Sequence, residues 1–413
     1  MHPPHLAALS SIVLALASCS AFETVPEEDP LPVELAPVTE FAAHLPTFDI
    51  RVDAEAFAEM TARYTEDIEL EAEVWLWRGA REILSGAPAE IQVRGNASAR
   101  FPLKSLGVKL DEGFDNGRRD LLDAPHVLPG QSLSELRNFR LRNGGNDFVG
   151  TLIKDLGYAR MLAASGLRVA PIYGEPAAAF VNGEFYGLLN LRTEGNANGV
   201  SRLLEIRKRD LLLAEVNYVG GATEAQPFEV KHGDVEVFRQ LEADIRAGDR
   251  AAALAAVDEA GFIDFILVHT VFAHGDWPWN NVKAYGVRGG RLHFMAFDFD
   301  LAASRDTDRD LLFHVRGPKP SYIADLFALA YEDEGFRRRF WDRRDEIMEG
   351  GALAPERLRE NFEALARAYE PLMAYQTAKY GYPESRTAWY LQLERYVEQY
   401  AGRYRVAQRT PRE

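Results

Sequence analysis

Apolar and polar residues follow two different periodicities along this chain, and the change falls near residue 233. Between residues 47 and 232, short runs alternate between apolar and polar positions, which is the spacing of half-buried β-strands. The predicted strands cover residues 48–52, 72–77, 90–93, 103–110, 136–141 and 210–216, with a hairpin over residues 175–193. Asn182 and Gly183, at the centre of that hairpin, are typical of a type I′ turn.

Helical periodicity dominates after residue 233. Predicted helices there cover residues 235–247, 251–259, 262–272, 322–331, 335–348, 355–378 and 384–400. Three further helices are predicted among the strands of the first part, over residues 54–67, 151–165 and 198–206. Strands gathered in one part and helices in the other indicate an α+β fold. We expect a β-rich lobe over residues 47–232 and an α-rich lobe over residues 233–413, with a functional site at their junction.

The stretch over residues 269–304 carries the strongest chemical signal. Asn281 follows Asp276 by five positions, and His274 precedes that aspartate by two. Protein kinases use this spacing in their catalytic loop, where the Asp orients the substrate hydroxyl and the Asn holds a metal ion. Asp298 and Asp300 then follow an apolar run at the end of a predicted strand, where a buried carboxylate is costly unless it is paired or bound to metal. These residues predict phosphoryl transfer, although strand-end carboxylates also commonly cap turns.

A glycine-containing loop between two predicted strands is a candidate phosphate site. It runs from Arg94 to Lys104 and combines small polar residues with two arginines. Its backbone N–H groups and cations could cradle phosphate, with Arg94 as a nucleotide-binding residue, or the loop could be a hairpin with solvated arginines. Lys104 and Lys109 lie on opposite faces of the next strand, so only one of them would reach a nucleotide, and the pattern leaves open which.

Composition narrows the classes of partner. The net charge of −16 argues against a general nucleic-acid binder. A nucleotide pocket in such an acidic chain must create a local positive potential from its own Lys and Arg residues and from metal ions.

The N-terminus predicts an exported lipoprotein. A mostly apolar run over residues 6–17 is followed by Ser18 and Cys19, the single cysteine of the chain, in a lipobox-like sequence. We therefore expect a signal peptide over residues 1–18, acylation of Cys19, and a Pro- and Glu-rich tether over residues 19–46. This arrangement would anchor the protein to a membrane of the cell envelope, the outer one if the cell has two. An ordinary secretory signal with an incidental cysteine is the alternative.

Three segments together resemble the CotH (spore coat protein H) kinase-like family. They are RGNAS at residues 94–98 with FPLKS at 101–105, the block from LRNG at 141–144 to Glu194, and the block from His274 through Asn280-Asn281 to FDFDL at 297–301. The order and spacing of the three segments carry the resemblance, which covers roughly residues 48–304. It implies an atypical protein-kinase-like fold that binds ATP and Mg²⁺ or Mn²⁺.

The resemblance also implies roles for individual residues. Asp276 would be the catalytic aspartate, Asn281 a metal ligand and Asp298 the main metal-binding aspartate. Lys104 would contact the nucleotide phosphates, with Glu194 as its partner. Asp300 would either assist the metal or hydrogen-bond to nearby backbone.

These expectations lead to one hypothesis and two alternatives. The first is a kinase-like phosphotransferase of the cell envelope that transfers phosphate from ATP to Ser or Thr of a partner protein. The second is a non-catalytic binding or structural lipoprotein of the envelope built on the same scaffold. The third is a nucleotidyl transferase or phosphohydrolase that uses the same site.

Overall fold

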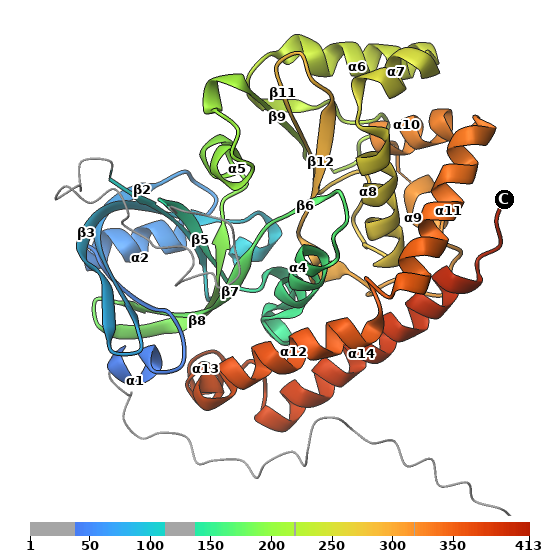
Figure 1. Ribbon diagram of the computed structural model, residues 1–413. Helices are drawn as coiled ribbons and strands as arrows, with labels where there is room; N and C mark the ends of the chain where they lie inside the picture. The colour runs from blue at the N-terminus through green and yellow to red at the C-terminus, as the bar shows by residue number, and fades with distance from the viewer. Residues whose placement is uncertain (1–37, 112–136, 219, 318) are drawn as a thin grey trace, which may run out of the picture.

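The computed structural model describes residues 38–111, 137–218, 220–317 and 319–413. Within these ranges the chain forms a β-barrel, a second and smaller sheet, and a helical lobe (Figure 1). The predicted mixture of strands and helices is confirmed, with the barrel in the first half and most helices in the second. A kinase-like arrangement of these elements stays a prediction.

The barrel is closed by a parallel contact between its first and last strands. Its spatial order is β1 (Thr47–Arg51), β2 (Glu69–Arg78), β3 (Arg81–Arg94), β4 (Ser105–Leu110), β5 (Asn138–Arg142), β8 (Glu184–Thr193) and β7 (Gly174–Val181). β1 pairs antiparallel with β2 and parallel with β7. In the β7–β8 hairpin, φ is 52° at Asn182 and 80° at Gly183, as the predicted type I′ turn requires.

The second sheet joins the two predicted lobes. Its order is β10 (Glu229–His232), β9 (Leu211–Val216), β11 (Val282–Val287), β12 (Leu292–Ala296) and β6 (Ala170–Pro171). β9 and β10 precede the predicted boundary at residue 233, whereas β11 and β12 follow it. The sheet therefore crosses that boundary, because the pattern of the sequence shows which segments are strands but not which of them pair.

The helices surround this sheet and the base of the barrel. They are α1 (Val38–Ala42), α2 (Ala54–Ala62), α4 (Lys154–Ala164), α5 (Ala197–Leu203), α6 (Val235–Ala247), α7 (Arg250–Ala256), α8 (Glu259–Val271), α9 (Phe313–Arg316), α10 (Tyr322–Tyr331), α11 (Glu334–Gly350), α12 (Pro355–Tyr369), α13 (Met373–Tyr380) and α14 (Arg386–Arg409). In Figure 1, α12 and α14 run side by side below α4, and α12 contacts both. Among the described residues, none of the helices combines the length and the apolar character that a membrane-spanning helix requires.

Two predicted helix boundaries differ from the structure for identifiable reasons. The helix predicted to begin at residue 262 begins at Glu259, because the side chain of Asp258 accepts a hydrogen bond from the N–H of Gly261 and caps the first turn. The single helix predicted over residues 355–378 is interrupted at residues 370–372, where Pro371 has no N–H to donate.

The end of the predicted tether is folded. Residues 38–42 form α1, and the ring of Phe41 is fully buried against Phe180, with 5.1 Å between ring centroids. Burial of an aromatic side chain stabilises such a short helix, which would be marginal alone. The predicted signal peptide, Cys19 and the rest of the tether lie outside the described residues.

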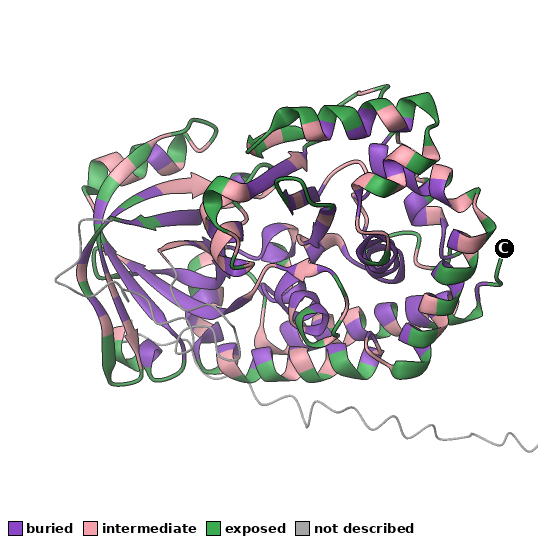
Figure 2. Ribbon diagram, turned by 45° about the horizontal axis from the view of Figure 1, so that its top comes forward, coloured by how far each residue is buried: buried purple, intermediate pink, exposed green. Residues whose placement is uncertain are grey.

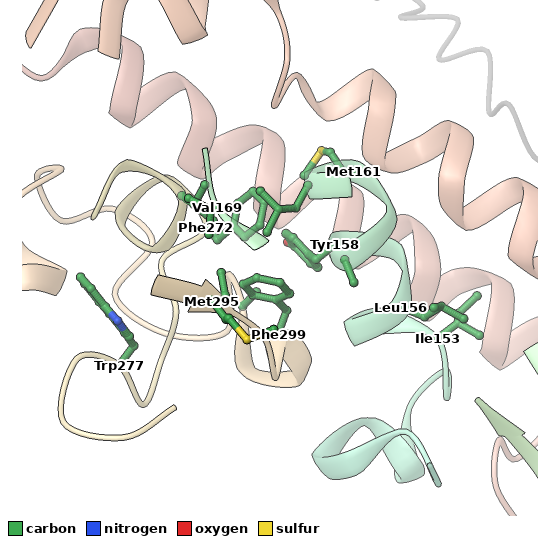
Figure 3. Close-up of a cluster of buried hydrophobic side chains, with 14 of the residues drawn as sticks. Ile153, Leu156, Tyr158, Met161, Val169, Phe272, Trp277, Met295 and Phe299 are labelled. Atoms are coloured by element: carbon green, nitrogen blue, oxygen red, sulfur yellow. The ribbon is translucent and has the colours of Figure 1, made fainter. Parts of the chain in front are cut away.

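The core that supports the candidate site lies between α4, α8 and β12. From Gly261 to Val271, every residue of α8 is buried, as expected for a helix that is apolar all round (Figure 2). Figure 3 shows Phe299 beside Tyr158 of α4 and Phe272, and its ring centroid lies 5.2 Å from that of Phe272. Because Phe299 separates Asp298 from Asp300, this packing fixes the backbone between the two carboxylates.

Candidate active site

The loop between α8 and β11 brings Asp276 and Asn281 together. The Nδ2 atom of Asn281 donates to Oδ1 of Asp276 over 3.0 Å, and Nδ2 of Asn280 donates to Oδ2 over 3.2 Å. Asn281 is buried and has a φ of 56°, a conformation in which asparagine is several-fold enriched among the non-glycine residues. The donation by its amide nitrogen leaves the amide oxygen of Asn281 as a possible metal ligand.

Stacked, buried rings pack against the loop that carries Asp276 and Asn281. The imidazoles of His269 and His274 are nearly parallel, and their Nδ1 atoms are 2.8 Å apart. Nε2 of His274 lies 3.2 Å from Oδ1 of Asp276. Burial lowers the pKa of His269 well below its usual value, whereas for His274 the bond and charge of Asp276 outweigh burial and raise the pKa. His274 is thus a buried neighbour that supports the carboxylate of Asp276.

The Asp298 loop begins where β12 ends. Asp298 has a left-handed backbone, with φ 65° and ψ 50°, and is followed by a 3₁₀ turn over Phe299–Leu301. Asp300 accepts a hydrogen bond from the N–H of Asn146 over 2.8 Å, which matches the backbone-bonding alternative expected for it. Left-handed non-glycine residues cost free energy and concentrate at functional sites, so this loop is held in place by its surroundings.

Arg142, at the end of β5, connects the barrel to both carboxylates of this loop. One of its Nη atoms donates to Asp298 and, over 3.1 Å, to Oδ2 of Asp300. Burial lowers the pKa of Arg142, but the charges of Asp298 and its neighbours outweigh burial and raise it. Burial, together with the charge of Asp298, raises the pKa of Asp300 to about 8 against the effect of Arg142.

Asp155 on α4 belongs to the site, although its role was not predicted from the sequence. Its Oδ2 lies 3.0 Å from Nη1 of Arg192 and 3.4 Å from Nε of Arg142, and its Oδ1 accepts from the N–H of Phe299 over 2.8 Å. Burial would raise the pKa of Asp155, but the two guanidinium groups hold it below its usual value. Asp155 thus links two barrel strands to the Asp298 loop, a relationship across about 140 residues that local patterning does not encode.

A cavity of about 570 Å³ opens beside Asp298. Its lining includes six cationic side chains, namely Arg94, Arg140, Arg142, Arg192, Lys231 and Lys283, and four acidic ones, namely Asp155, Glu194, Glu215 and Asp298. The volume lies in the range of small-molecule sites. The cationic side chains on the lining exceed the acidic ones by two.

Five buried polar atoms on this lining have no hydrogen-bond partner among the described residues: Nε of Arg94, Nε of Arg142, Nε and Nη1 of Arg192, and Oγ1 of Thr193. Those of Arg142 and Arg192 belong to guanidinium groups that form ion pairs with Asp155. A buried donor without a partner costs free energy, and a bound ligand or an ordered water would satisfy it. The predicted site residues Arg94 and Glu194 both line the cavity, although Glu194 accepts two 3.3 Å hydrogen bonds from Arg140 instead of pairing with Lys104.

Lys104 is directed away from this cavity. Its ammonium donates to the backbone carbonyls of Ala99 and Phe101, each over 2.8 Å, and lies 4.3 Å from the centroid of the Tyr64 ring. Lys109 pairs with Glu90 and is also not part of the lining. Thus neither lysine lines the cavity, because Lys104, which precedes β4, bonds to its own loop, and Lys109, on β4, pairs with Glu90 of β3.

Lys283 on β11 lines this cavity, where Lys104 was expected. Its ammonium lies 3.0 Å from Oε2 of Glu215 and donates to the carbonyl of Gly195 over 2.9 Å. Burial would raise the pKa of Glu215, but the charge of Lys283 and its other partners lower it to about 2. The sequence contained one signal for Lys283, its position two residues after Asn281 on the strand that follows the catalytic loop.

The oxygen atoms of this site suit a hard divalent cation. In the described part of the chain, His, Cys, Asp and Glu side chains do not form a group of three or more that could hold a metal ion by themselves. Mg²⁺ in phosphotransfer sites is usually held by one or two carboxylates together with substrate phosphates and water. Asn281 and Asp298 offer oxygen atoms of this kind, but Asp276 and Asn281 are not among the residues that line the cavity beside Asp298, and the carboxylate of Asp298 is paired with Arg142.

The comparison with protein families identifies the family to which the chain belongs. The family model described as CotH kinase protein matches residues 91–407. The matched range includes Asp276, Asn281 and Asp298 and the whole lining of the cavity. No curated protein matches the sequence.

Proposed function

Because the chain belongs to the CotH kinase protein family, we propose that it is a metal-dependent phosphotransferase that moves the γ-phosphate of ATP to a Ser or Thr hydroxyl of a partner protein. The observation that carries the proposal is the position of Asp298 on the wall of a cavity lined by six cationic side chains. The six cationic side chains exceed the four acidic ones on this lining, so an excess of two positive charges lies at one cavity of a strongly acidic chain, and a polyphosphate would neutralise it.

The phosphates would be held by the cationic side chains of the cavity. Arg94 offers an unpartnered buried N–H, and Lys283 offers an ammonium held in place by Glu215. Asn281 and Asp298 would hold Mg²⁺ or Mn²⁺, which neutralises charge on the phosphates when bound. The catalytic power then comes mainly from positioning and from electrostatic stabilisation.

Asp276 would position the acceptor. Its carboxylate is fixed by Asn280, Asn281 and His274, and His274 keeps its pKa low by outweighing the effect of burial. An ionised carboxylate can accept the hydrogen bond of a Ser or Thr hydroxyl and orient its oxygen toward phosphorus. The new bond joins that oxygen to the γ-phosphorus, the bond from the γ-phosphorus to the bridging oxygen breaks, ADP leaves, and the hydroxyl proton passes to Asp276.

The location of the activity is the cell envelope. This part of the proposal rests on the lipobox-like sequence at Cys19 and on the Pro- and Glu-rich segment after it. The partner protein would then be another envelope component. Metabolic labelling with a clickable palmitate analogue, lost in Cys19→Ala, tests acylation; unlabelled wild-type protein would contradict it.

The central test combines nucleotide binding with transfer. Full-length protein should show a rise in melting temperature with ATP and Mg²⁺ or Mn²⁺, and Asp298→Ala should abolish it. Asp308→Ala, which removes an exposed carboxylate ten residues further on, is the matched control and should retain the shift. Phosphate incorporation into envelope proteins should be lost in Asp276→Asn. An unchanged shift in Asp298→Ala, or a product mass that corresponds to nucleotide addition, would overturn the proposal.

A further inference from the structure

A second cavity, of about 540 Å³, lies where α4 and α12 meet the barrel. It shares no lining residue with the cavity beside Asp298. Its lining residues are His44, Leu45, Pro46, Arg78, Ala159, Arg160, Ala163, Ala164, Tyr173, Gly174, Glu175, Pro176, Ala364 and Ala368. Nothing in the proposed phosphotransfer uses this cavity.

Two arginines and one glutamate line this cavity, and burial raises the pKa of Glu175 to about 8 against the effect of Arg78 and Arg160. Arg78 and Glu175 satisfy each other through two hydrogen bonds of 3.1 Å. Arg160, on α4, makes no hydrogen bond or ion pair with any residue that the structure describes, although it lines the same cavity. Burial lowers the pKa of Arg160 and the charge of Glu175 opposes that effect. A largely buried guanidinium without a partner is costly, so this arrangement favours an anionic ligand.

The rest of the lining is apolar and small. Five alanines, three from α4 and two from α12, face the cavity together with Pro46 and Pro176. Small side chains on two packed helices leave room that larger residues would fill, and they present methyl groups to whatever enters. Tyr173 adds one hydroxyl to the lining. A ligand for this cavity therefore combines an anionic head with an apolar body.

We propose that this second cavity binds a small organic monocarboxylate, with its carboxylate on Arg160 and its apolar body along the alanines of α4 and α12. A planar carboxylate matches the fork of a guanidinium in a bidentate manner. Because Glu175 already forms two hydrogen bonds with Arg78, Arg160 is the guanidinium of this lining that is left to hold the carboxylate.

Isothermal titration of the full-length protein with hexanoate tests this site. Saturable binding is expected, and Arg160→Ala should weaken it at least about tenfold, the loss that follows removal of one charge-assisted partner. Arg168→Ala, which removes an exposed arginine just beyond the same helix, is the matched control and should bind as wild type does. Ala163→Phe, which fills the cavity from its rim, should also abolish binding and keeps the proposal testable if Arg160→Ala fails to fold.

Two further arms test the sign of the head group and separate the two cavities. Hexylammonium should not bind, because its charge has the same sign as that of Arg160. Asp298→Ala should retain hexanoate binding, because the two cavities have separate linings. Absence of saturable hexanoate binding, equal binding by Arg160→Ala, or equal binding of hexylammonium would each overturn the proposal.

Discussion

The guanidinium of Arg142 forms an ion pair with the carboxylate of Asp298, the residue that is expected to bind a metal ion. The same guanidinium bonds to Asp300 and lies near Asp155. Arg142 therefore stabilises the metal-free site, since three buried or half-buried carboxylates would otherwise repel one another. Metal binding must compete with this arginine for Asp298.

Replacement of Arg142 should make the site both less stable and more dependent on metal. Arg142→Gln leaves the buried carboxylates uncompensated, so we expect a loss of about 3 kcal/mol in the free energy of unfolding without metal. Added Mn²⁺ should restore more stability in this variant than in wild type, because no arginine competes for Asp298. Denaturant unfolding with and without Mn²⁺ measures both effects.

The control for this experiment is Arg140→Gln. Arg140 lines the same cavity but pairs with Glu194. The Arg140→Gln variant should gain as much stability from Mn²⁺ as wild type does. An equal response in Arg142→Gln and wild type would mean that Arg142 does not compete with metal for Asp298.

Substitutions of Lys283 and Lys104 should have different effects, the first on ATP affinity and the second on the free energy of unfolding. Lys283→Met should weaken ATP binding about tenfold or more, because it removes the ammonium that Glu215 holds in the cavity. Lys104→Met should leave ATP affinity unchanged but lower the free energy of unfolding by about 1–3 kcal/mol, because two buried carbonyls lose their donor. Titration calorimetry and denaturant unfolding distinguish the two. If Lys104→Met weakens ATP binding and Lys283→Met does not, the original sequence assignment is correct.

This exchange of lysines shows what the sequence could and could not predict about the site. Asp276 and Asn281 are close in the chain, so their spacing was enough to select both as candidates, and the structure adds the hydrogen bond between them. Arg142, Asp155 and Lys283 reach the site only because the barrel closes and the second sheet pairs β9 with β11. Those are long-range pairings, which apolar periodicity does not specify.

The fold shows the same difference between local features, which were predicted, and long-range pairings, which were not. Periodicity located most helices and the β7–β8 hairpin, because helical spacing and turn residues are local properties. It did not predict that β9 and β10 would join β11 in one sheet across the expected lobe boundary. It also placed residues 38–46 in an extended tether, since the burial of Phe41 depends on the barrel that it contacts.

Gly145 should be intolerant of a side chain. Its φ is 68°, and a β-carbon there would lie 2.0 Å from Oδ2 of Asp300. Gly145→Ala should therefore lower the free energy of unfolding by at least about 2 kcal/mol, because a left-handed alanine is strained and its β-carbon would displace Asp300. Gly166→Ala is the matched control, because φ there is 73° and nothing lies within 4 Å of the new β-carbon. That control should lose only about 1 kcal/mol. Equal losses in the two variants would contradict the close approach of Asp300.

His314 should make the protein sensitive to mild acid. Burial and the nearby charge of Arg403 lower the pKa of His314 to about 4. In the unfolded chain its pKa is about 6.5, so the unfolded state binds the proton more tightly than the folded state does. The stability due to neutral His314 is therefore fully present above pH 6.5 and is lost as the pH falls toward 4.

Comparison with His314→Gln isolates this effect from other titrating groups. Between pH 7 and pH 5 the free energy of unfolding of wild type should fall by about 2 kcal/mol more than that of the variant. Urea unfolding of both proteins at the two pH values measures this difference. The sign is decisive, because a histidine stabilised in its charged form would make wild type gain stability relative to the variant as the pH falls. Parallel pH profiles would mean that His314 is not held neutral by its surroundings.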